Sequence, residues 1–567
     1  MTRHRRRAAP LAVLLVLGLA ACAPALPETV VPGSEIVVGW TGSLTSTNAS
    51  ASPTAGNVDV AEMIRADFGD VIDGEFVPDE GFGAVTIVGE DPFTVRYDLA
   101  EPAWSDGIPL DAADLLLGWA GASGYFPDAE DADAAEMIPE DAPEVPSIDE
   151  FARSIDVTFA QPRIDWQQAV TVPVPAHIVG RIAFGEDDDM AAKQAVIRAI
   201  QEGDTAALAK ISEVWNTGFE IADPDDLTTE RLISSGPFQV DGIEVADERQ
   251  SVTLVPNPGY RGLVTPKVAR IDLVPPGDNP VAAISDVLDV AQVAPTSANR
   301  GPIHDLERED FAVETAHDGT MWSVLLKPSG IFSQKEARTA FIHAVPASGL
   351  VERGAGEWAS AYTGTTSMVS APGSRAYDIV NEDSGFTEIL GTTDDEPALE
   401  RERAGVAAGS RVCVLYDRGS DFATGVFSAM REAAAEAGWE AVDCGSDDFD
   451  AALDQRRWDA VIARVPIPRT PEQIAVQWGS EGTASITRQA DPDRDELIAQ
   501  LAQTTDVYDA REVLARIEAT IVRAAVALPL ATNPRVTIVD RDVTGVTARS
   551  GVAAPLTYGA VQWETVP

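Results

Sequence analysis

Histidine is scarce in this chain, with only five among its 567 residues. Beyond the N-terminal stretch the histidines lie far apart in the sequence, at His177, His304, His317 and His343. Two hydrolase signatures are missing: there is no His-Glu-x-x-His motif, and residues 121–124 miss a Gly-x-Ser-x-Gly nucleophile elbow by one residue. Because distant residues can converge in a fold, these absences argue against a secreted hydrolase without excluding one.

Positive charge is also in short supply. The chain has 41 lysines and arginines against 91 acidic residues, a formal net charge of −50. The electric field of such a negatively charged protein repels phosphates, and this excludes nucleic acid as a partner. The acidic run 128–133 lacks the glycine and the closing glutamate of a calcium loop. We therefore predict no metal site and no cofactor, and interpret the acidic runs as solvated surface.

Long apolar runs are absent except near the N-terminus. Residues 8–19 are apolar and follow four arginines, but they are too short to span a bilayer, which takes about 20 residues. The next residues, Ala20-Ala21-Cys22, resemble the lipobox of bacterial lipoproteins, in which the cysteine thiol takes a diacylglyceryl group. We predict a lipid anchor on Cys22. The alternative is an ordinary secretory peptide with an accidental cysteine.

Only three cysteines are present. With Cys22 assigned to lipid, Cys413 and Cys444 are left in a compartment that tolerates disulfides. Cys413 lies on one predicted strand and Cys444 just past the next, and such strands can be neighbours in a parallel sheet. We predict a disulfide between them. The alternative is two buried thiols.

The apolar pattern is that of a large globular chain with more than one lobe. Its clearest stretch alternates strand and helix: strands at 411–416, 439–443 and 458–463 flank helices at 425–437 and 451–457. This alternation predicts α/β structure with a parallel sheet covered by helices.

Several motifs together resemble one known family. The most specific is residues 104–119, where Trp-Ser-Asp-Gly is followed by an Asp-containing helix that ends in Trp, and Asp111 is placed to cap that helix. Further similar segments follow in order at 235–240, 257–262, 286–291, 335–341 and 528–530. With these motifs behind a lipobox, the chain resembles the actinobacterial type of solute-binding lipoproteins of ABC importers, family 5 (oligopeptide, dipeptide and nickel class).

The resemblance implies a two-lobed, periplasmic-binding-protein-like α/β fold of the class II (cluster C) type. The first lobe would contain an inserted subdomain, and a two-segment hinge would join it to the second lobe. The expected parts are a signal peptide (1–21), a tether (22–34), lobe I (35–56, 172–310 and 526–567), the inserted subdomain (57–171) and lobe II (311–525).

The resemblance also implies a function. The chain would be a monomer held by its lipid on the extracytoplasmic face of the cell membrane. It would capture a small solute, foremost an oligopeptide, between its lobes and deliver it to ABC permease subunits. Few histidines argue against direct nickel coordination. A binding protein that serves as a sensor or chaperone and passes no cargo remains an alternative.

Four residues are predicted to contact the ligand. Trp40 ends the first predicted strand, Trp322 begins another, and Trp478 follows the β-α-β run; a core or rim role is the alternative for each. Peptide-binding relatives often carry an acidic residue just after the strand that matches 460–463, whereas this chain has Arg464. A guanidinium there would bind a carboxylate bidentately, and the alternative is a surface or interlobe salt bridge.

Overall fold

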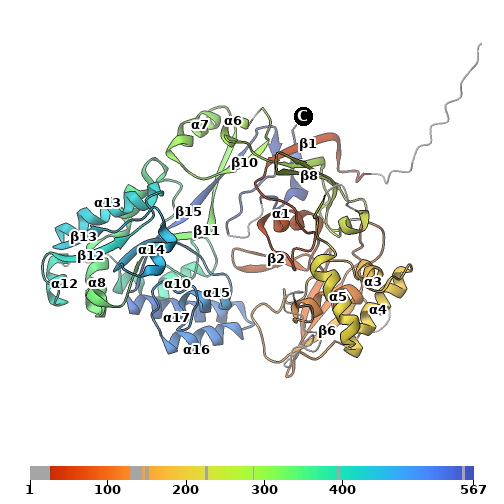
Figure 1. Ribbon diagram of the computed structural model, residues 1–567, viewed down its shortest axis with the longest axis horizontal. Helices are drawn as coiled ribbons and strands as arrows, with labels where there is room; N and C mark the ends of the chain where they lie inside the picture. Colours follow the sequence, from red (N-terminus) through yellow and green to blue (C-terminus); the bar gives the residue numbers. More distant parts are fainter. Residues whose placement is uncertain are drawn as a thin grey trace, which may run out of the picture.

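The molecule has two lobes that share two long strands, β11 (Ala312–Leu326) and β15 (Ala527–Val539). In Figure 1 the first lobe lies on the right, the second lies on the left, and these strands pass between them. The computed structural model describes residues 26–127, 143–146, 148, 152–223, 228–284, 286–391, 396–551 and 556–566. Cys22, the predicted signal peptide and the acidic run 128–133 lie outside the described residues.

One ten-stranded sheet runs through both lobes, in the order β13-β12-β14-β11-β15-β10-β1-β9-β8-β7. β11 and β15 are antiparallel, and their register shifts between His317 and Met321 and again between Trp322 and Ser323. Such irregularities bend a strand. They fall where the two strands pass from the first-lobe part of the sheet to the second-lobe part.

The second lobe confirms the predicted parallel β-α-β run. β12 pairs in parallel with both β13 and β14, and helices α13 and α14 connect them. Successive residues of β11 and β14 point to opposite sides of this sheet, and most of them are apolar. Both faces of the sheet are therefore covered by apolar side chains. The elements are β12 (Ser410–Leu415), α13 (Asp421–Glu436), β13 (Trp439–Asp443), α14 (Phe449–Gln455) and β14 (Ala460–Pro466).

Further helices pack on this sheet. The face that bears Trp322 is covered by α8, α9 and α13, and the opposite face by α15, α16 and α17. Their bounds are α8 (Lys335–Ala344), α9 (Ala347–Ala355), α10 (Tyr377–Asp383), α11 (Phe386–Ile389), α12 (Pro397–Arg403), α15 (Pro471–Trp478), α16 (Pro492–Ala502) and α17 (Val507–Ala524).

The first lobe is built on the other end of the sheet. Its core gathers apolar residues from β1, β7, β8, β9 and α1, and from the C-terminal segment around Trp563. The elements are β1 (Val31–Gly39), α1 (Ala55–Ile64), β7 (Phe238–Ala246), β8 (Arg249–Pro256), β9 (Val268–Val274), α6 (Pro280–Ala283), β10 (Val290–Val293), α7 (Ser297–Glu307), β16 (Val543–Thr544) and β17 (Glu564–Thr565).

The subdomain has its own hydrophobic core, and that core differs from the predicted segment 57–171. It runs from Phe68 to Ile233, because helices α3, α4 and α5 pack against α2, whereas α1 packs in the first-lobe core. The elements are β2 (Gly69–Ile72), β3 (Glu75–Pro78), β4 (Gly83–Glu90), β5 (Phe93–Leu99), α2 (Ala112–Ala122), β6 (Ser154–Phe159), α3 (Ala176–Phe184), α4 (Asp189–Glu202) and α5 (Thr205–Thr217).

The Trp104 motif is explained by one buried carboxylate. Asp114, fully buried in α2, accepts hydrogen bonds from Trp104 Nε1 (3.3 Å), the Asp111 backbone (3.0 Å), the Ala176 backbone (2.8 Å) and Lys193 Nζ (2.9 Å). Asp111 caps α2 as predicted and also contacts Lys193. The motif therefore joins the turn to α2, α3 and α4 within the subdomain.

In the part of the chain that the structure describes, no helix is both long and apolar enough to cross a membrane.

Candidate functional site

Two of the four predicted ligand residues meet at the junction of the lobes. Trp322 on β11 lies directly opposite Arg464 on β14. Residues opposite one another in an antiparallel pair project from the same face. Trp322 is buried, whereas 52% of the Arg464 side chain is exposed. An apolar ring and an accessible guanidinium thus lie side by side.

A network of polar side chains surrounds this pair. Asn533 on β15 accepts a hydrogen bond from Trp322 Nε1 (2.9 Å) and donates one to Asp318 (2.7 Å). The other Asp318 oxygen accepts from the backbone and the hydroxyl of Thr320, at 2.9 and 2.5 Å. Arg464 Nη1 lies 3.9 Å from Asp318, a loose ion pair. The network fixes the position of Asp318 and leaves the guanidinium of Arg464 only weakly engaged.

Three aromatic rings stack beside the network. Trp322 packs on Phe422 at the start of α13, with ring centroids 4.8 Å apart, and Phe422 packs on Tyr362 at 4.7 Å. Burial and the nearby charge of Asp318 raise the pKa of Tyr362 to about 12, and Arg464 opposes that shift. The Tyr362 hydroxyl therefore stays protonated at neutral pH, close to both Asp318 and Arg464.

Trp40 lies in the first-lobe core, the alternative to ligand contact that its place in the sequence left open. It is 3% exposed, packs in the first-lobe core, and donates through Nε1 to Asp59 of α1 at 2.8 Å. Burial raises the pKa of Asp59, and Arg535 on β15 is close enough to lower it. Trp40 therefore orients an acid that faces the shared strand β15.

Trp478 lies on the opposite face of the second-lobe sheet from Trp322. It packs with Met321 and Val461 in the core under α16 and α17, and its carbonyl accepts a hydrogen bond from buried Arg494 (2.9 Å). The second-lobe sheet lies between this core and the core that contains Trp322.

Cys413 and Cys444 are joined by a disulfide, with Cα atoms 5.6 Å apart. The bond links β12 to the residue that follows β13, which are parallel neighbours. It lies within the second-lobe sheet and does not take part in the interlobe network.

Several residues of the site have no local signal in the sequence. Asp318 and Asn533 lie 215 residues apart and meet only because β11 and β15 pair. Phe422 and Tyr362 come from a helix and a loop with no distinguishing pattern around them. Among the described residues, no group of three or more histidine, cysteine or acidic side chains could hold a metal ion. A guanidinium beside aromatic rings can instead bind an acid group and the apolar part of a small molecule.

The family assignment rests on a comparison with known families. The model of the bacterial extracellular solute-binding proteins, family 5 (Middle), matches residues 88–442. The chain belongs to this family. Family 5 proteins are the solute-binding proteins of ABC importers, and they are binding proteins, not enzymes.

Relatives and solved structures agree with this family 5 assignment. A lipoprotein of Mycobacterium tuberculosis of uncharacterised function is 26% identical over 365 residues, which is 61% of each chain, so the match spans less than two thirds of the relative. A periplasmic EDTA-binding protein, EppA, superposes with a TM-score of 0.72 at 18% identity, covering 94% of this chain and 97% of that one.

The oligopeptide-binding protein AppA of Bacillus subtilis, solved with a nonapeptide, gives a TM-score of 0.58 at 12% identity, over 94% of this chain and 99% of that one. At such low identities these likenesses show the fold alone. They confirm the predicted two-lobed, periplasmic-binding-protein-like α/β class for this family 5 protein.

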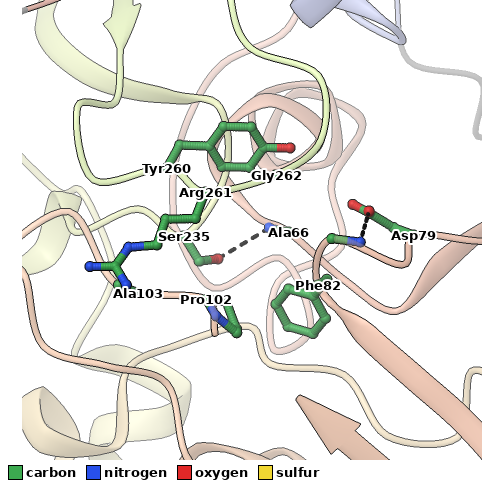
Figure 2. A pocket seen from close by; sticks show the side chains of 10 residues that line it. Ala66, Asp79, Phe82, Pro102, Ala103, Ser235, Tyr260, Arg261 and Gly262 are labelled. Atoms are coloured by element: carbon green, nitrogen blue, oxygen red, sulfur yellow. Dashed lines mark hydrogen bonds between the residues drawn. The ribbon is translucent and has the colours of Figure 1, made fainter. Parts of the chain in front are cut away.

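The family 5 protein also has a hollow away from the interlobe site. Figure 2 shows it between the subdomain and the first lobe, with Tyr260, Arg261 and Ser235 on one side and Asp79 and Phe82 on the other. It encloses about 240 Å³ including the solvent at its mouth. Among the described residues, those that line it belong to the subdomain and the first lobe.

Proposed function

We propose that this family 5 protein is anchored by lipid on Cys22, captures a small solute between its lobes and delivers it to ABC permease subunits. An oligopeptide is the foremost candidate for the solute. The observation that carries the proposal is the site at the junction of the lobes, where Arg464 and Trp322 project together beside the two shared strands. A ligand bound there would be covered when the lobes close.

The division into lobes is part of the proposal. β11 and β15 would act as the two hinge segments, because their register shifts lie between the first-lobe and second-lobe parts of the sheet. Bending at these irregular positions would let the lobes move as rigid bodies. The tether would comprise residues 22–34 and the second lobe residues 311–525. The subdomain would extend as far as its hydrophobic core, which ends at Ile233.

The roles of the predicted residues divide into two kinds. We propose that Arg464 and Trp322 contact the ligand, because they share one face and the guanidinium is accessible. Trp40 and Trp478 would have structural roles in the cores. Trp40 would orient Asp59, and Trp478 would pack against one face of the second-lobe sheet.

The anchor and the location are supported by the relatives, which are named lipoproteins. A tether would hold the binding protein at high effective concentration beside its permease. We propose a monomer on the extracytoplasmic face, and a disulfide between Cys413 and Cys444 in the exported protein. Mass spectrometry would show native protein two hydrogens lighter than reduced protein.

The test is to identify what the protein carries. The purified chain would be examined by native mass spectrometry for a co-purified ligand, and by thermal shift against pools of free tripeptides and tetrapeptides. Uptake of the identified ligand would then be measured in cells with and without the gene. A bound ligand whose uptake survives deletion would favour a sensor or chaperone role, and absence of any ligand would contradict solute capture.

A further inference from the structure

The interlobe site holds as many guanidinium groups as carboxylates, although the whole chain carries a large excess of acid. Arg464 is 3.9 Å from Asp318, and that carboxylate already accepts hydrogen bonds from Asn533 and Thr320. Elsewhere an exposed arginine such as Arg96 is held bidentately by its own acid at 2.7 Å. The loose pairing of Arg464 is therefore not forced by a shortage of acids.

Arg535 adds a second guanidinium to the site. It lies two residues after Asn533 on β15, so the two side chains project from the same face. Its Nη2 donates to the Arg549 carbonyl at 3.1 Å. Its Nε is buried and has no hydrogen-bond partner among the described residues. A buried donor without an acceptor is unfavourable, and a bound ligand is one group that can provide the acceptor.

The two carboxylates near Arg535 both accept hydrogen bonds from other residues. Burial lowers the pKa of Arg535, and the charges of Asp318 and Asp59 oppose that shift, which places both carboxylates in its neighbourhood. Asp318 is bound by Asn533, and Asp59 accepts from Trp40 Nε1. In the described part of the chain neither acid forms an ion pair with Arg535 within 4.0 Å.

We propose that the ligand is an anion whose acid group binds the guanidinium groups of Arg464 and Arg535. This inference rests on the proposed capture of a solute between the lobes. A carboxylate accepts paired N–H groups from a guanidinium, and it would give Arg535 Nε the acceptor it lacks. The rings of Trp322, Phe422 and Tyr362 provide an apolar wall for the rest of the molecule. For a peptide ligand, the acid group is the C-terminal or a side-chain carboxylate.

The test uses matched probes that differ only in the acid group. Calorimetry would compare free tripeptides with their C-terminal amides, and glucuronate with glucose, at 50 and 300 mM salt. Native mass spectrometry would identify any co-purified compound and show whether it is an acid. We expect the acid of a bound pair to bind at least tenfold more tightly than its neutral partner, and more weakly at high salt.

Two variants and one control separate this chemistry from a general loss of structure. Arg464→Gln changes an exposed side chain, and Arg535→Gln removes the unpartnered donor; each should weaken the acid by about tenfold to a hundredfold and leave the neutral probe unchanged. Arg353→Gln, in an exposed ion pair with Glu432 away from the site, should bind like the parent chain. Melting temperatures would confirm that all three variants fold.

The outcomes are distinct. Equal binding of acid and neutral probes, or a co-purified ligand without an acid group, would overturn the anion assignment and leave solute capture intact. Acid binding that survives both arginine variants would also overturn it. Absence of any bound compound, from either the probes or the cell, would overturn solute capture itself.

Discussion

At the scale of single residues, buried charges explain which parts of the sequence pattern are structural. Asp114 and Lys193 are almost fully buried, and Asp114 also receives three hydrogen bonds from the surrounding turn and helices. Removing Asp114 would leave buried Lys193 with the partly exposed Asp111 as its charge partner, and would take the acceptor from three hydrogen-bond donors in the core.

We therefore expect Asp114→Ala to lower the free energy of unfolding by roughly 3–5 kcal/mol, because Lys193 would lose its main partner. Urea unfolding followed by circular dichroism would measure this. The matched control is Asp156→Ala, which breaks the exposed pair with Arg96 in the same subdomain and should cost less than about 1 kcal/mol. Equal losses for both variants would contradict the structural role of Asp114.

Glu518 gives a residue-scale prediction about pH. It is buried on α17 and accepts hydrogen bonds from Ser367 Oγ (2.7 Å) and from the backbone of Met368 (2.9 Å) and Val369 (3.1 Å). Burial raises the pKa of Glu518 to about 7, against an ordinary 4.5, and these hydrogen bonds oppose the rise only in part. The folded state therefore holds a proton that the unfolded state releases between these two values.

The contribution of Glu518 to stability is fully present below about pH 4.5 and declines as the pH rises through about 7. Glu518→Gln keeps an acceptor oxygen but cannot ionise, so this decline, on the order of 2–3 kcal/mol, should disappear. Unfolding free energies at pH 5, 6, 7 and 8 would be compared for both chains. Parallel pH profiles would show that ionisation of Glu518 does not affect folding.

At the scale of elements, the hairpin β2–β3 links the two lobes away from the shared strands. Its two-residue turn, Asp73-Gly74, has positive φ at both positions, as a tight hairpin turn requires. Figure 1 places the hairpin on the side of the first lobe that faces the second. Glu75 forms ion pairs with Arg511 of α17 and with Arg375 (2.8 Å).

A second contact accompanies this ion pair. The backbone of Ile164, in the segment after β6, donates to the carbonyl of Ala502 at the end of α16 at 3.0 Å. The Ile164 side chain packs against the second-lobe core. Both contacts join the subdomain to helices α16 and α17, so both must break for the lobes to separate.

We expect Glu75→Gln to favour the open form by about 1–3 kcal/mol, because Arg511 and Glu75 are mostly buried and would lose their charge pairing. Small-angle scattering of the ligand-free chain would show a larger radius of gyration in the variant. High salt should expand the parent chain and have less effect on the variant. Asp156→Ala again serves as the control, and identical scattering from parent and Glu75→Gln would contradict the expectation.

At the scale of the whole molecule, the proposed lipid anchor would hold the two-lobed body at the membrane. The body carries a strong negative charge, so electrostatic attraction would not hold it on an anionic membrane. Acyl chains on Cys22 would hold it by hydrophobic burial alone, and two or more chains are needed for stable anchoring.

Cys22→Ser should therefore move the protein from the membrane fraction to the soluble fraction, while ligand affinity measured on purified protein stays the same. Fractionation of cells expressing each form would test this. A variant that still sediments with membranes after a high-salt wash would contradict lipid anchoring through Cys22.

The sequence by itself determined the features that depend on neighbouring residues. The alternating pattern of 411–463 predicted the parallel strands, and Asp111 predicted the start of α2, because strand alternation and helix capping act over a few residues. The motif at 104–119 predicted the family, which the match over 88–442 shows.

Only the tertiary structure decided which distant residues share a face. It paired Trp322 with Arg464, and brought Asn533 and Arg535 beside them, through strand registers that no local pattern specifies. It also separated Trp478 from that face, and extended the subdomain core to Ile233. The physical reason is that contacts between remote segments depend on how whole sheets pack, and a one-residue change of register would turn the side chains of the shifted strand to the other face.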